Sequence, residues 1–381
     1  MAFLKPALGL ALAAMTAASA VAAEKGAYYF YVGTYTGKSS KGIYQYKFDP
    51  ATAKVESLGL VAETPNPTFL VVHPSHKYLY AANEVGRFNG QRTGSVTAFR
   101  MELGGKLTAL NTVSSHGDGP CHVSIDRTGK FVLVANYGGG SIAVLPIRAD
   151  GSLGEATAAI QHAGSSVNKG RQREPHGHSI YASADNKFVI AADLGIDKLM
   201  VYKFDAQKGN LTPNDPPAAS LKPGSGPRHF AFHPKGKFAY SANELFSNVT
   251  AFDWDAAKGT LTEKQTISTL PEGFTGNNSD AEIEVHPNGK FLYASNRGHD
   301  SVAVFSIASD GTLKMVEAAP LGVKTPRHFA IAPGGTYLFA EGQDSNNFTL
   351  LKLDPKTGKL TGTGQKFELG SPVCIVFAPV L

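Results

Sequence analysis

The sequence predicts an all-β fold, a seven-bladed β-propeller built from four-stranded antiparallel blades. A unit of roughly fifty residues recurs along the chain, and each copy contains short alternating apolar stretches separated by turn residues. The first and last stretches of the chain complement each other as two parts of one unit. The composition agrees, because 41 glycines, 22 prolines and only 18% charged residues suit many short strands better than helical bundles.

The recurrent unit is clearest in two copies, GPRHFAFHPKGKFAYSAN at 226–243 and SDAEIEVHPNGKFLYASN at 279–296. Each copy reads as a strand, a turn that contains Gly-Lys, and a second strand that ends in small residues and usually Asn. A third apolar strand follows, then a turn with Gly before Leu and a fourth strand, and four strands make one propeller blade. The other copies lie at 66–83, 119–136, 176–193 and 325–342.

The two ends of the sequence set the number of blades. Residues 28–35 match the second strand of the unit, and residues 371–379 match the first strand that this N-terminal unit lacks. We therefore expect the C-terminal strand to complete the first blade, which closes the ring and leaves no exposed inner edge. Six complete units and one composite unit make seven blades in a single domain over residues 24–381.

Residues 1–23 have the pattern of a cleavable secretory signal peptide. Lys5 precedes an apolar run over 6–18, and small residues lead to an expected cleavage site near Ala22 or Ala23. The apolar run is shorter than the ~20 residues that a membrane-spanning helix needs. We expect a periplasmic or secreted protein with no membrane contact after cleavage.

Charge and cysteine content restrict the partners. The net charge of +5 is spread thinly, without the basic run or aromatic-interleaved stripe that nucleic-acid binding needs. Cys121 and Cys374 fall on the inner strands of the third and first blades, too far apart in this register for a disulfide. We expect two buried thiols in a monomer that binds no nucleic acid.

Two sets of equivalent positions are expected near the central channel. Ligand sites in a propeller fall where residue types depart from what blade packing needs. The start of each inner strand carries Thr68, Cys121, His178, Arg228, Ala281, Arg327 and Val373, followed directly by Phe69, His122, Ser179, His229, Glu282, His328 and Cys374. The turn after each second strand carries Tyr35, Glu84, Tyr137, Leu194, Glu244, Arg297 and Gln343.

The residues that vary between blades carry the functional prediction, because buried Arg, His and Glu are costly without partners. The predicted catalytic residues are His176, His178, Arg228, Glu244 and Arg297, and the predicted substrate-binding residues are His122, Glu282, Arg327, Asn136 and Asp193. Some positions have an equally simple structural explanation. Asn136 belongs to a repeated Asn that can cap the turn, and His229 and His328 recur beside Arg. His73, His233 and His286 precede turn prolines and are expected to be turn residues only.

This set of side chains suits the chemistry of an anionic ester. Converging arginines hold a carboxylate or phosphate by bidentate, charge-assisted hydrogen bonds. A neighbouring His and Glu can act as base and acid. The sequence lacks a Gly-x-Ser-x-Gly elbow, which argues against serine acyl-enzyme chemistry. Glu174, His176 and His178 could bind a metal, but no Cys or third His lies near them, and we expect no metal and no cofactor.

The units resemble the lactonase family of seven-bladed propellers, which includes propeller-type 6-phosphogluconolactonases and fungal carboxy-cis,cis-muconate cyclases. The resemblance covers the whole mature chain. Its motifs are GPCHV at 119–123, ANYGGGS at 135–141, PHGHS at 175–179, ADLGID at 192–197, GPRHF at 226–230, NEL at 243–245 and SNRG at 295–298. The proposed active-site residues of the cyclase branch fall by motif on His176 or His178, Arg228, Glu244 and Arg297. The last full unit reads AEGQ at 340–343 where other blades have Asn, which weakens the case for Gln343.

The resemblance implies hydrolysis of a sugar lactone such as 6-phosphogluconolactone. Arginines would bind the anionic group and polarise the carbonyl, His178 or His176 would activate water, and Glu244 would protonate the leaving oxygen or orient the base. Export favours an unphosphorylated or carboxylated lactone, because phosphorylated sugar lactones are cytoplasmic metabolites. The alternatives are a lactonising enzyme of the carboxy-cis,cis-muconate cyclase type and a non-catalytic propeller that binds a ligand or partner.

Overall fold

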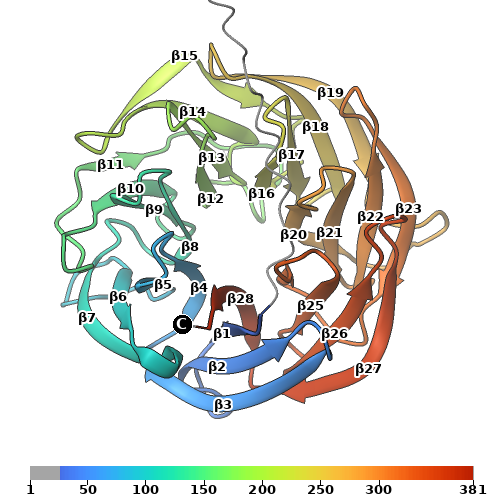
Figure 1. Cartoon of the computed structure of the whole chain (residues 1–381). Coiled ribbons are helices and arrows are strands. Elements are labelled where there is room, and N and C mark those ends of the chain that lie inside the picture. Colours follow the sequence, from blue (N-terminus) through green and yellow to red (C-terminus); the bar gives the residue numbers. More distant parts are fainter. Residues whose placement is uncertain (1–25, 381) are drawn as a thin grey trace, which may run out of the picture.

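The computed structural model describes residues 26–380 of the 381-residue chain, so the predicted signal peptide over 1–23 lies outside the described residues. Seven four-stranded antiparallel sheets are arranged in a ring (Figure 1). The predicted seven-bladed propeller is confirmed, and so is the composite first blade. The C-terminal strand β28 pairs with the N-terminal strand β1, with Tyr28 opposite Pro379.

The strands of each blade run outward from the centre in chain order, except that β28 is the innermost strand of blade one. Blade one contains β28 (Pro372–Pro379), β1 (Tyr28–Thr34), β2 (Gly42–Asp49) and β3 (Lys54–Glu63). Blade two contains β4 (Pro67–Val72), β5 (Tyr78–Asn83), β6 (Ser95–Met101) and β7 (Leu107–Ser114). Blade three contains β8 (Pro120–Ile125), β9 (Phe131–Asn136), β10 (Ser141–Pro146) and β11 (Ala158–Gln161).

Blades four to seven repeat this arrangement. Blade four contains β12 (Gly177–Ala182), β13 (Phe188–Asp193), β14 (Lys198–Asp205) and β15 (Asn210–Ser220). Blade five contains β16 (Pro227–Phe232), β17 (Phe238–Asn243), β18 (Asn248–Asp255) and β19 (Thr260–Ser268). Blade six contains β20 (Ser279–Val285), β21 (Phe291–Arg297), β22 (Ser301–Ile307) and β23 (Leu313–Pro320). Blade seven contains β24 (Phe329–Ile331), β25 (Tyr337–Gly342), β26 (Asn347–Leu353) and β27 (Leu360–Glu368).

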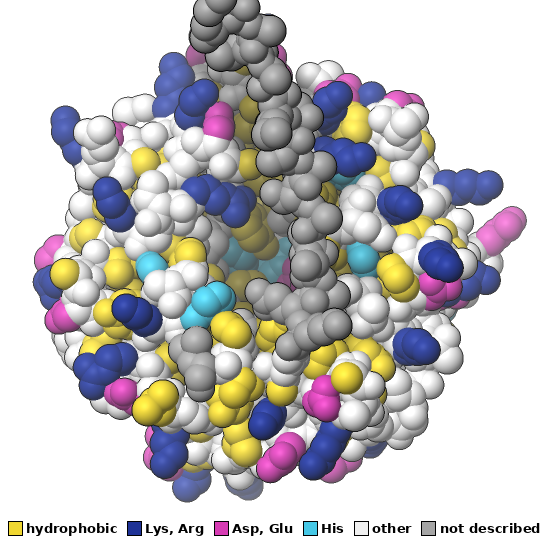
Figure 2. Space-filling model, in the orientation of Figure 1, with side chains coloured by type: hydrophobic (Ala, Val, Ile, Leu, Met, Phe, Trp, Pro, Cys, Tyr) yellow, Lys and Arg dark blue, Asp and Glu magenta, His cyan; other side chains and the backbone are white. Residues whose placement is uncertain are grey.

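A short 3₁₀ turn, η1 (Leu103–Gly105), links β6 to β7. Between residues 26 and 380, no helix has the length and the apolar character that crossing a membrane would need. Charged side chains of both signs are interspersed around one face of the ring, and the centre of that face is hollow with histidine side chains in view (Figure 2).

The hydrophobic core lies between neighbouring blades. Where the ring closes, the Phe30 ring of blade one lies 4.9 Å from that of Phe339 in blade seven, and Phe48 lies 5.1 Å from Phe339. These residues belong to one buried cluster shared by the first and last blades. Burial of such large aromatic side chains is a major source of stability, so the two ends of the ring are joined by packing as well as by the shared sheet.

Tyrosines on second strands connect each of four blades to the next. Each donates a hydrogen bond from its hydroxyl to a glycine carbonyl in the following blade. The pairs are Tyr31 to Gly105 at 2.6 Å, Tyr80 to Gly151 at 3.0 Å, Tyr240 to Gly311 at 3.1 Å and Tyr293 to Gly358 at 2.8 Å. The turn glycines of the repeat therefore receive bonds between blades.

The predicted turn histidines His73, His233 and His286 also connect blades. The Nε2 atom of His286 lies 2.8 Å from the carbonyl of Gly335 in the next blade, while its Nδ1 accepts a hydrogen bond from the Asn288 amide. A Cβ on Gly335 would lie 2.7 Å from the His286 ring, and φ there is +68°, so both space and backbone conformation require glycine. His73 and His233 make equivalent bonds.

A β-bulge near the start of the inner strand determines which side chains reach the channel. In six blades, the inner strand carries one more residue than its partner at this point. Successive side chains of a regular strand point to opposite faces, and a bulge interrupts that alternation. Consecutive residues such as Arg228 and His229, or Thr68 and Phe69, consequently line the same small internal cavity.

Candidate functional site

A cavity of about 300 Å³ lies where the inner strands begin and the second strands end. Its lining comes from several blades and is strongly charged. The lining residues are Tyr35, Glu84, Tyr137, Arg171, His178, Glu244, Ser279, Arg297 and Arg327. Three of the five predicted catalytic residues, His178, Glu244 and Arg297, are among them. Arg228 lies against Glu244 and lines the small cavity instead.

Most lining residues come from the two positions in the repeat that the sequence indicates. His178 stands at the start of inner strand β12 and Arg327 two residues before inner strand β24. Glu84, Glu244 and Arg297 stand at the end of second strands or just after them. Arg171 has a different origin. It belongs to residues 162–176, the longest connection between consecutive blades, which links β11 to β12.

Glu244 is the centre of the site. Its Oε1 lies 2.6 Å from Nη2 of Arg171, and its Oε2 lies 2.9 Å from Nη2 of Arg297 and 3.1 Å from Nε of Arg228. Burial alone would raise the pKa of this carboxyl, but the charges of Arg297, Arg228 and Arg171 lower it to about 2. Glu244 is therefore ionised at neutral pH.

Arg228 is almost completely buried, with 1% of its surface exposed. Its Nη1 donates a hydrogen bond of 2.6 Å to the carbonyl of Ala281 in the next blade. Burial and the nearby charges of Arg297 and Arg327 lower the pKa of this guanidinium to about 9. Arg228 still carries its charge at neutral pH, and its ion pair with Glu244 offsets part of the cost of burial.

Arg327, Glu84 and Tyr35 form a second charged group in the cavity. The Tyr35 hydroxyl donates to both carboxylate oxygens of Glu84 at 2.9 Å, and Oγ1 of Thr68 donates to Oε2 at 2.7 Å. Arg327 lies 4.0 Å from Glu84 and its guanidinium carbon is 5.6 Å from the centre of the Tyr35 ring. Burial raises the pKa of Tyr35, which keeps its hydroxyl protonated.

His178 and His176 occupy different environments. His178 is buried, and its Nε2 lies 4.0 Å from Oε2 of Glu244 while its Nδ1 lies 3.7 Å from the sulfur of Cys121. Burial and the charge of Arg228 hold the pKa of His178 well below its usual value, so the ring is neutral. His176 instead stacks on Tyr137, with ring centres 4.4 Å apart, and does not line the cavity.

Of the predicted substrate-binding residues, only Arg327 lines the central cavity of about 300 Å³. His122 and Glu282 are buried in the layer beneath it. The Asn136 amide nitrogen donates to the carbonyl of Ser115 and the hydroxyl of Ser141. Asp193 pairs with His162 at 2.6 Å and accepts the backbone amide of His176 at 2.8 Å. Asn136 and Asp193 thus hold turns next to the site.

The sequence-based selection omitted five lining residues, one of which is Ser279 at the start of β20. Tyr35, Glu84 and Tyr137 stand at an equivalent repeat position that the sequence identifies, but their pairing across blades is visible only in three dimensions. Arg171 lies outside the repeat unit. The available signal for it was the length of the connection over 162–176 and its basic stretch KGRQRE at 169–174.

Across residues 26–380, no group of three or more His, Cys, Asp or Glu side chains is arranged to hold a metal ion. Glu174, which the sequence places near His176 and His178, does not line the cavity that His178 lines. The two cysteines, Cys121 and Cys374, are buried and free, as predicted.

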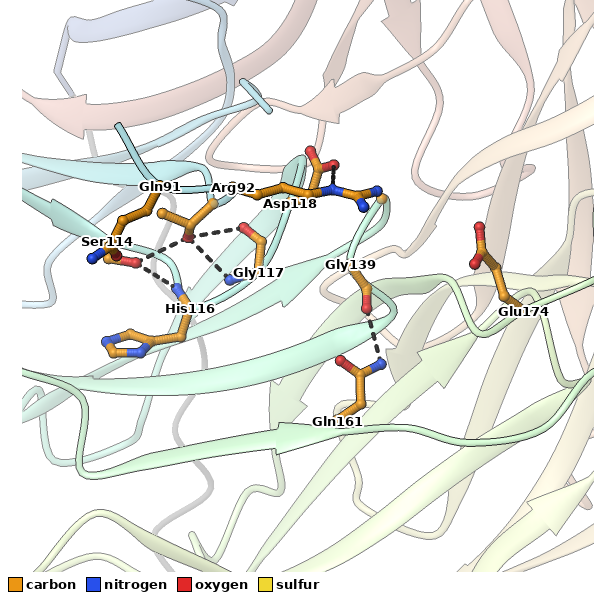
Figure 3. Close-up of a pocket in the computed structure, with 11 residues that line it drawn as sticks. Gln91, Arg92, Ser114, His116, Gly117, Asp118, Gly139, Gln161 and Glu174 are labelled. Carbon is orange, nitrogen blue, oxygen red and sulfur yellow. Dashed lines mark hydrogen bonds and ion pairs between the residues drawn. The ribbon is translucent and has the colours of Figure 1, made fainter. Parts of the chain in front are cut away.

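A second cavity of about 500 Å³ lies beside the β7–β8 and β9–β10 turns (Figure 3). Arg92 pairs with Asp118 there at 3.3 Å, and the Gln161 amide donates to the carbonyl of Gly139 at 2.9 Å. Glu174 lies across the cavity from them (Figure 3). Arg92, Gln161 and Glu174 are exposed, whereas the central cavity has buried, unlike charges in contact.

Comparison with known proteins agrees with the sequence motifs. Residues 29–377 match the family described as "Lactonase, 7-bladed beta-propeller". A 6-phosphogluconolactonase of Bacillus subtilis (strain 168) is 38% identical over 352 residues, which cover 92% of this chain and 98% of the relative. A 6-phosphogluconolactonase of Formosa agariphila is 35% identical over 338 residues, which cover 87% of this chain and 94% of the relative.

The solved structure of the periplasmic gluconolactonase PpgL of Pseudomonas aeruginosa superposes with a TM-score of 0.88 at 36% sequence identity. The superposition covers 93% of this chain and 100% of that chain. The match therefore includes every blade of the ring. On the family match and these relatives, the chain belongs to the lactonase family of seven-bladed β-propellers.

Proposed function

We propose that this protein is a lactonase that opens an anionic sugar lactone in the central cavity. The observation that carries the proposal is the charge of the site. Arg171, Arg297 and Arg327 line the cavity and Arg228 lies against Glu244, whereas the carboxylates among the described lining residues are those of Glu84 and Glu244. Two positive charges remain to hold a phosphate or carboxylate group of the substrate. The names of the Bacillus and Formosa relatives support a substrate of the 6-phosphogluconolactone type.

The arginines also suit the transition state of ester hydrolysis. Attack of water on the lactone carbonyl places negative charge on its oxygen, and preorganised donors in a water-poor site stabilise that charge. Arg297 is 14% exposed at its side chain and Arg228 only 2%, so Arg297 is the one that can reach substrate directly. Arg228 supports it by holding Glu244.

His178 is the proposed general base. Its ring is neutral, and its Nε2 faces the cavity beside Glu244, where it can take a proton from the attacking water. The His178 imidazole can return this proton to the ring oxygen of the lactone as the bond between that oxygen and the acyl carbon breaks. Glu244 cannot be the acid, because its pKa of about 2 leaves it ionised. Of the two roles predicted for Glu244, orientation of the base and the arginines is the one we retain.

We further propose that the protein acts in the periplasm or outside the cell. The signal-peptide pattern over 1–23 and the periplasmic relative from Pseudomonas support this location. That relative is called a gluconolactonase, so an unphosphorylated lactone is a second candidate substrate. The excess positive charge favours a phosphorylated or carboxylated lactone over a neutral one.

The test is a lactone-opening assay with the mature protein on gluconolactone, its 6-phosphate and muconolactones. The reaction is monitored by the protons that it releases at constant pH. We expect opening of the phosphorylated or carboxylated substrate, and a fall of about 10²-fold or more in kcat/KM for Arg297→Ala and Glu244→Ala. Glu174→Ala, at an exposed position of the second cavity, is the control and should retain the wild-type rate.

Unchanged turnover in Arg297→Ala and Glu244→Ala would contradict this site. Cyclisation of a carboxylated muconate, without hydrolysis of sugar lactones, would identify the alternative lactonising activity, which could use the same arginines. Binding of these compounds with no turnover of any of them would support a non-catalytic propeller.

A further inference from the structure

Beneath the central cavity, a second layer of the channel contains a buried histidine paired with a glutamate. His229 and Glu282 are 2% and 4% exposed. The Nδ1 atom of His229 lies 2.9 Å from Oε2 of Glu282, whereas its Nε2 atom is buried and has no hydrogen-bond partner within residues 26–380. The arrangement fixes one nitrogen of the ring against a carboxylate and leaves the other free.

The partner of Nδ1 decides which nitrogen can accept a proton. A carboxylate accepts hydrogen bonds, so Nδ1 of His229 carries the hydrogen and Nε2 has a free lone pair. His122, whose ring lies 5.3 Å away, has the opposite arrangement, because its Nδ1 accepts the amide of Ile180 at 3.3 Å. His122 therefore carries its hydrogen on Nε2, and His229 is the acceptor of the two.

A small cavity is lined by residues of this layer and of the site above. Its volume is about 10 Å³, enough for one water molecule, and its lining includes His229, Cys121 and Arg228. Arg327 lines both this small cavity and the central cavity. Cys121 also touches the proposed base, with its sulfur 3.7 Å from Nδ1 of His178. These side chains therefore lie where the substrate cavity and this layer meet.

On the basis of the proposed lactonase function, we propose that His229 and Glu282 form a proton-accepting pair. The pair takes the proton released when the lactone opens, through one water in the small cavity. Opening first gives a carboxylic acid, and the surrounding arginines favour its carboxylate. The acid O–H bond breaks, the water passes a proton on, and an N–H bond forms at Nε2 of His229. The imidazolium returns its proton to solvent after the product leaves.

The charges around His229 suit a transient acceptor. Burial lowers the pKa of His229 well below its usual value, with further contributions from Arg228 and His328, so the ring is neutral before each turnover. Glu282 is also 3.4 Å from Nε2 of His328 and accepts the amide of Ile283 on its other oxygen. The titratable and charged groups around the His229 ring are Glu282, His122, His178, His328, Arg228, Arg327 and Arg297.

The first test compares Glu282→Gln with Glu284→Gln on the same strand. Glu284 is half-buried two residues further along β20 and accepts the Ile331 amide rather than a histidine. Burial raises the pKa of Glu284 to about 8, so an amide there replaces a protonated acid. We expect Glu282→Gln to lower kcat about 10²-fold with KM little changed, and Glu284→Gln to match wild type. Equal kcat in the two variants would overturn the proposal.

The second test needs no variant and no activity. Nitrogen NMR of histidine-labelled wild-type protein at pH 7 should show Nδ1 of His229 protonated and Nε2 bare; a hydrogen on Nε2 would overturn the proposal even if Glu282→Gln fails to fold. If the wild type opens no lactone, the proposed function fails. If it opens lactones and Glu282→Gln equals Glu284→Gln, only the proton-accepting pair fails.

Discussion

The histidine side chains of the channel differ in charge although all of them are buried. Burial lowers the pKa of His122, His178 and His229 and leaves them neutral. Burial would do the same to His328, but Glu341 at 3.1 Å and Glu282 at 3.4 Å raise its pKa to about 9. The same residue type is therefore a base in one blade and a fixed cation in another, depending on its neighbours.

Because the pKa of His328 is raised, we expect the free energy of unfolding to depend on pH in the alkaline range. A group whose pKa is higher in the folded state stabilises the fold fully below its unfolded pKa of 6.5 and loses this contribution as pH rises through about 9. We expect the free energy of unfolding to fall by up to about 3 kcal/mol across this window. Denaturant unfolding at several pH values, for wild type and His328→Gln, measures it. An identical pH dependence in both proteins would contradict the prediction.

At the residue scale, the sequence predicts the kinds of side chain in the channel better than their roles. Glu244 and Arg297 occupy repeat positions that blade packing does not require, so comparison of the blades identifies them. Asp193 occupies the preceding position, where other blades carry Asn, and its carboxylate is used by His162 and the backbone. Only the three-dimensional partners distinguish these cases.

At the element scale, the connection over residues 162–176 carries Arg171 into the cavity. One guanidinium nitrogen, Nη2, contacts both Oε1 of Glu244 at 2.6 Å and the Tyr137 hydroxyl at 3.0 Å. Repeat comparison misses Arg171 because no other blade has an equivalent segment. The segment is an addition to the fold, and we expect its effect to fall on substrate rather than on stability.

Arg171→Ala should lower kcat/KM for an anionic lactone by about 10²-fold, because it removes one of the charges that hold substrate and Glu244. Arg173→Ala is a matched control two residues away, where the side chain is exposed and bonds to a backbone carbonyl. Steady-state kinetics of both variants with equal melting temperatures would establish the difference. Similar kinetic losses in both would indicate a general effect of charge in this segment.

The tyrosine bonds between blades give a second prediction at this scale. Tyr80→Phe removes the hydroxyl that donates to the Gly151 carbonyl at 3.0 Å in a buried position. We expect a loss of about 0.5–1.5 kcal/mol in the free energy of unfolding. Tyr78→Phe on the same strand is the control, because its bond to Ala149 is 3.5 Å long and exposed. Urea unfolding should rank the two variants in this order, and the reverse order would count against the blade-to-blade role.

At the scale of the whole molecule, β28 joins the two ends of the chain in one sheet. Removal of residues 372–381 would expose the inner edge of β1 and the aromatic cluster shared by blades one and seven. We expect this truncated protein to lose its cooperative unfolding transition, whereas a chain ending at Pro379 should keep it. Near-ultraviolet circular dichroism and calorimetry test both, and a cooperative transition in the truncated protein would show that blade packing alone closes the ring.

The overall fold is more predictable from the sequence than the site. The repeat shows the same strand pattern in several copies, and residues 28–35 and 371–379 identify the composite blade. The bulges in the inner strands are less predictable from the sequence. They admit consecutive residues such as Arg228 and His229 to the channel, yet they follow from strand register, which the residue pattern alone does not specify.

The pairing of Tyr28 with Pro379 places the first and last strand residues on adjacent strands, about 4.8 Å apart. A short linker between them would give a circular permutant that starts at β4 and ends with β3. Every sheet would then be a continuous meander, and no blade would be shared between chain ends. Such a chain would keep the native contacts while removing the strand exchange, and so would separate the contribution of connectivity from that of packing.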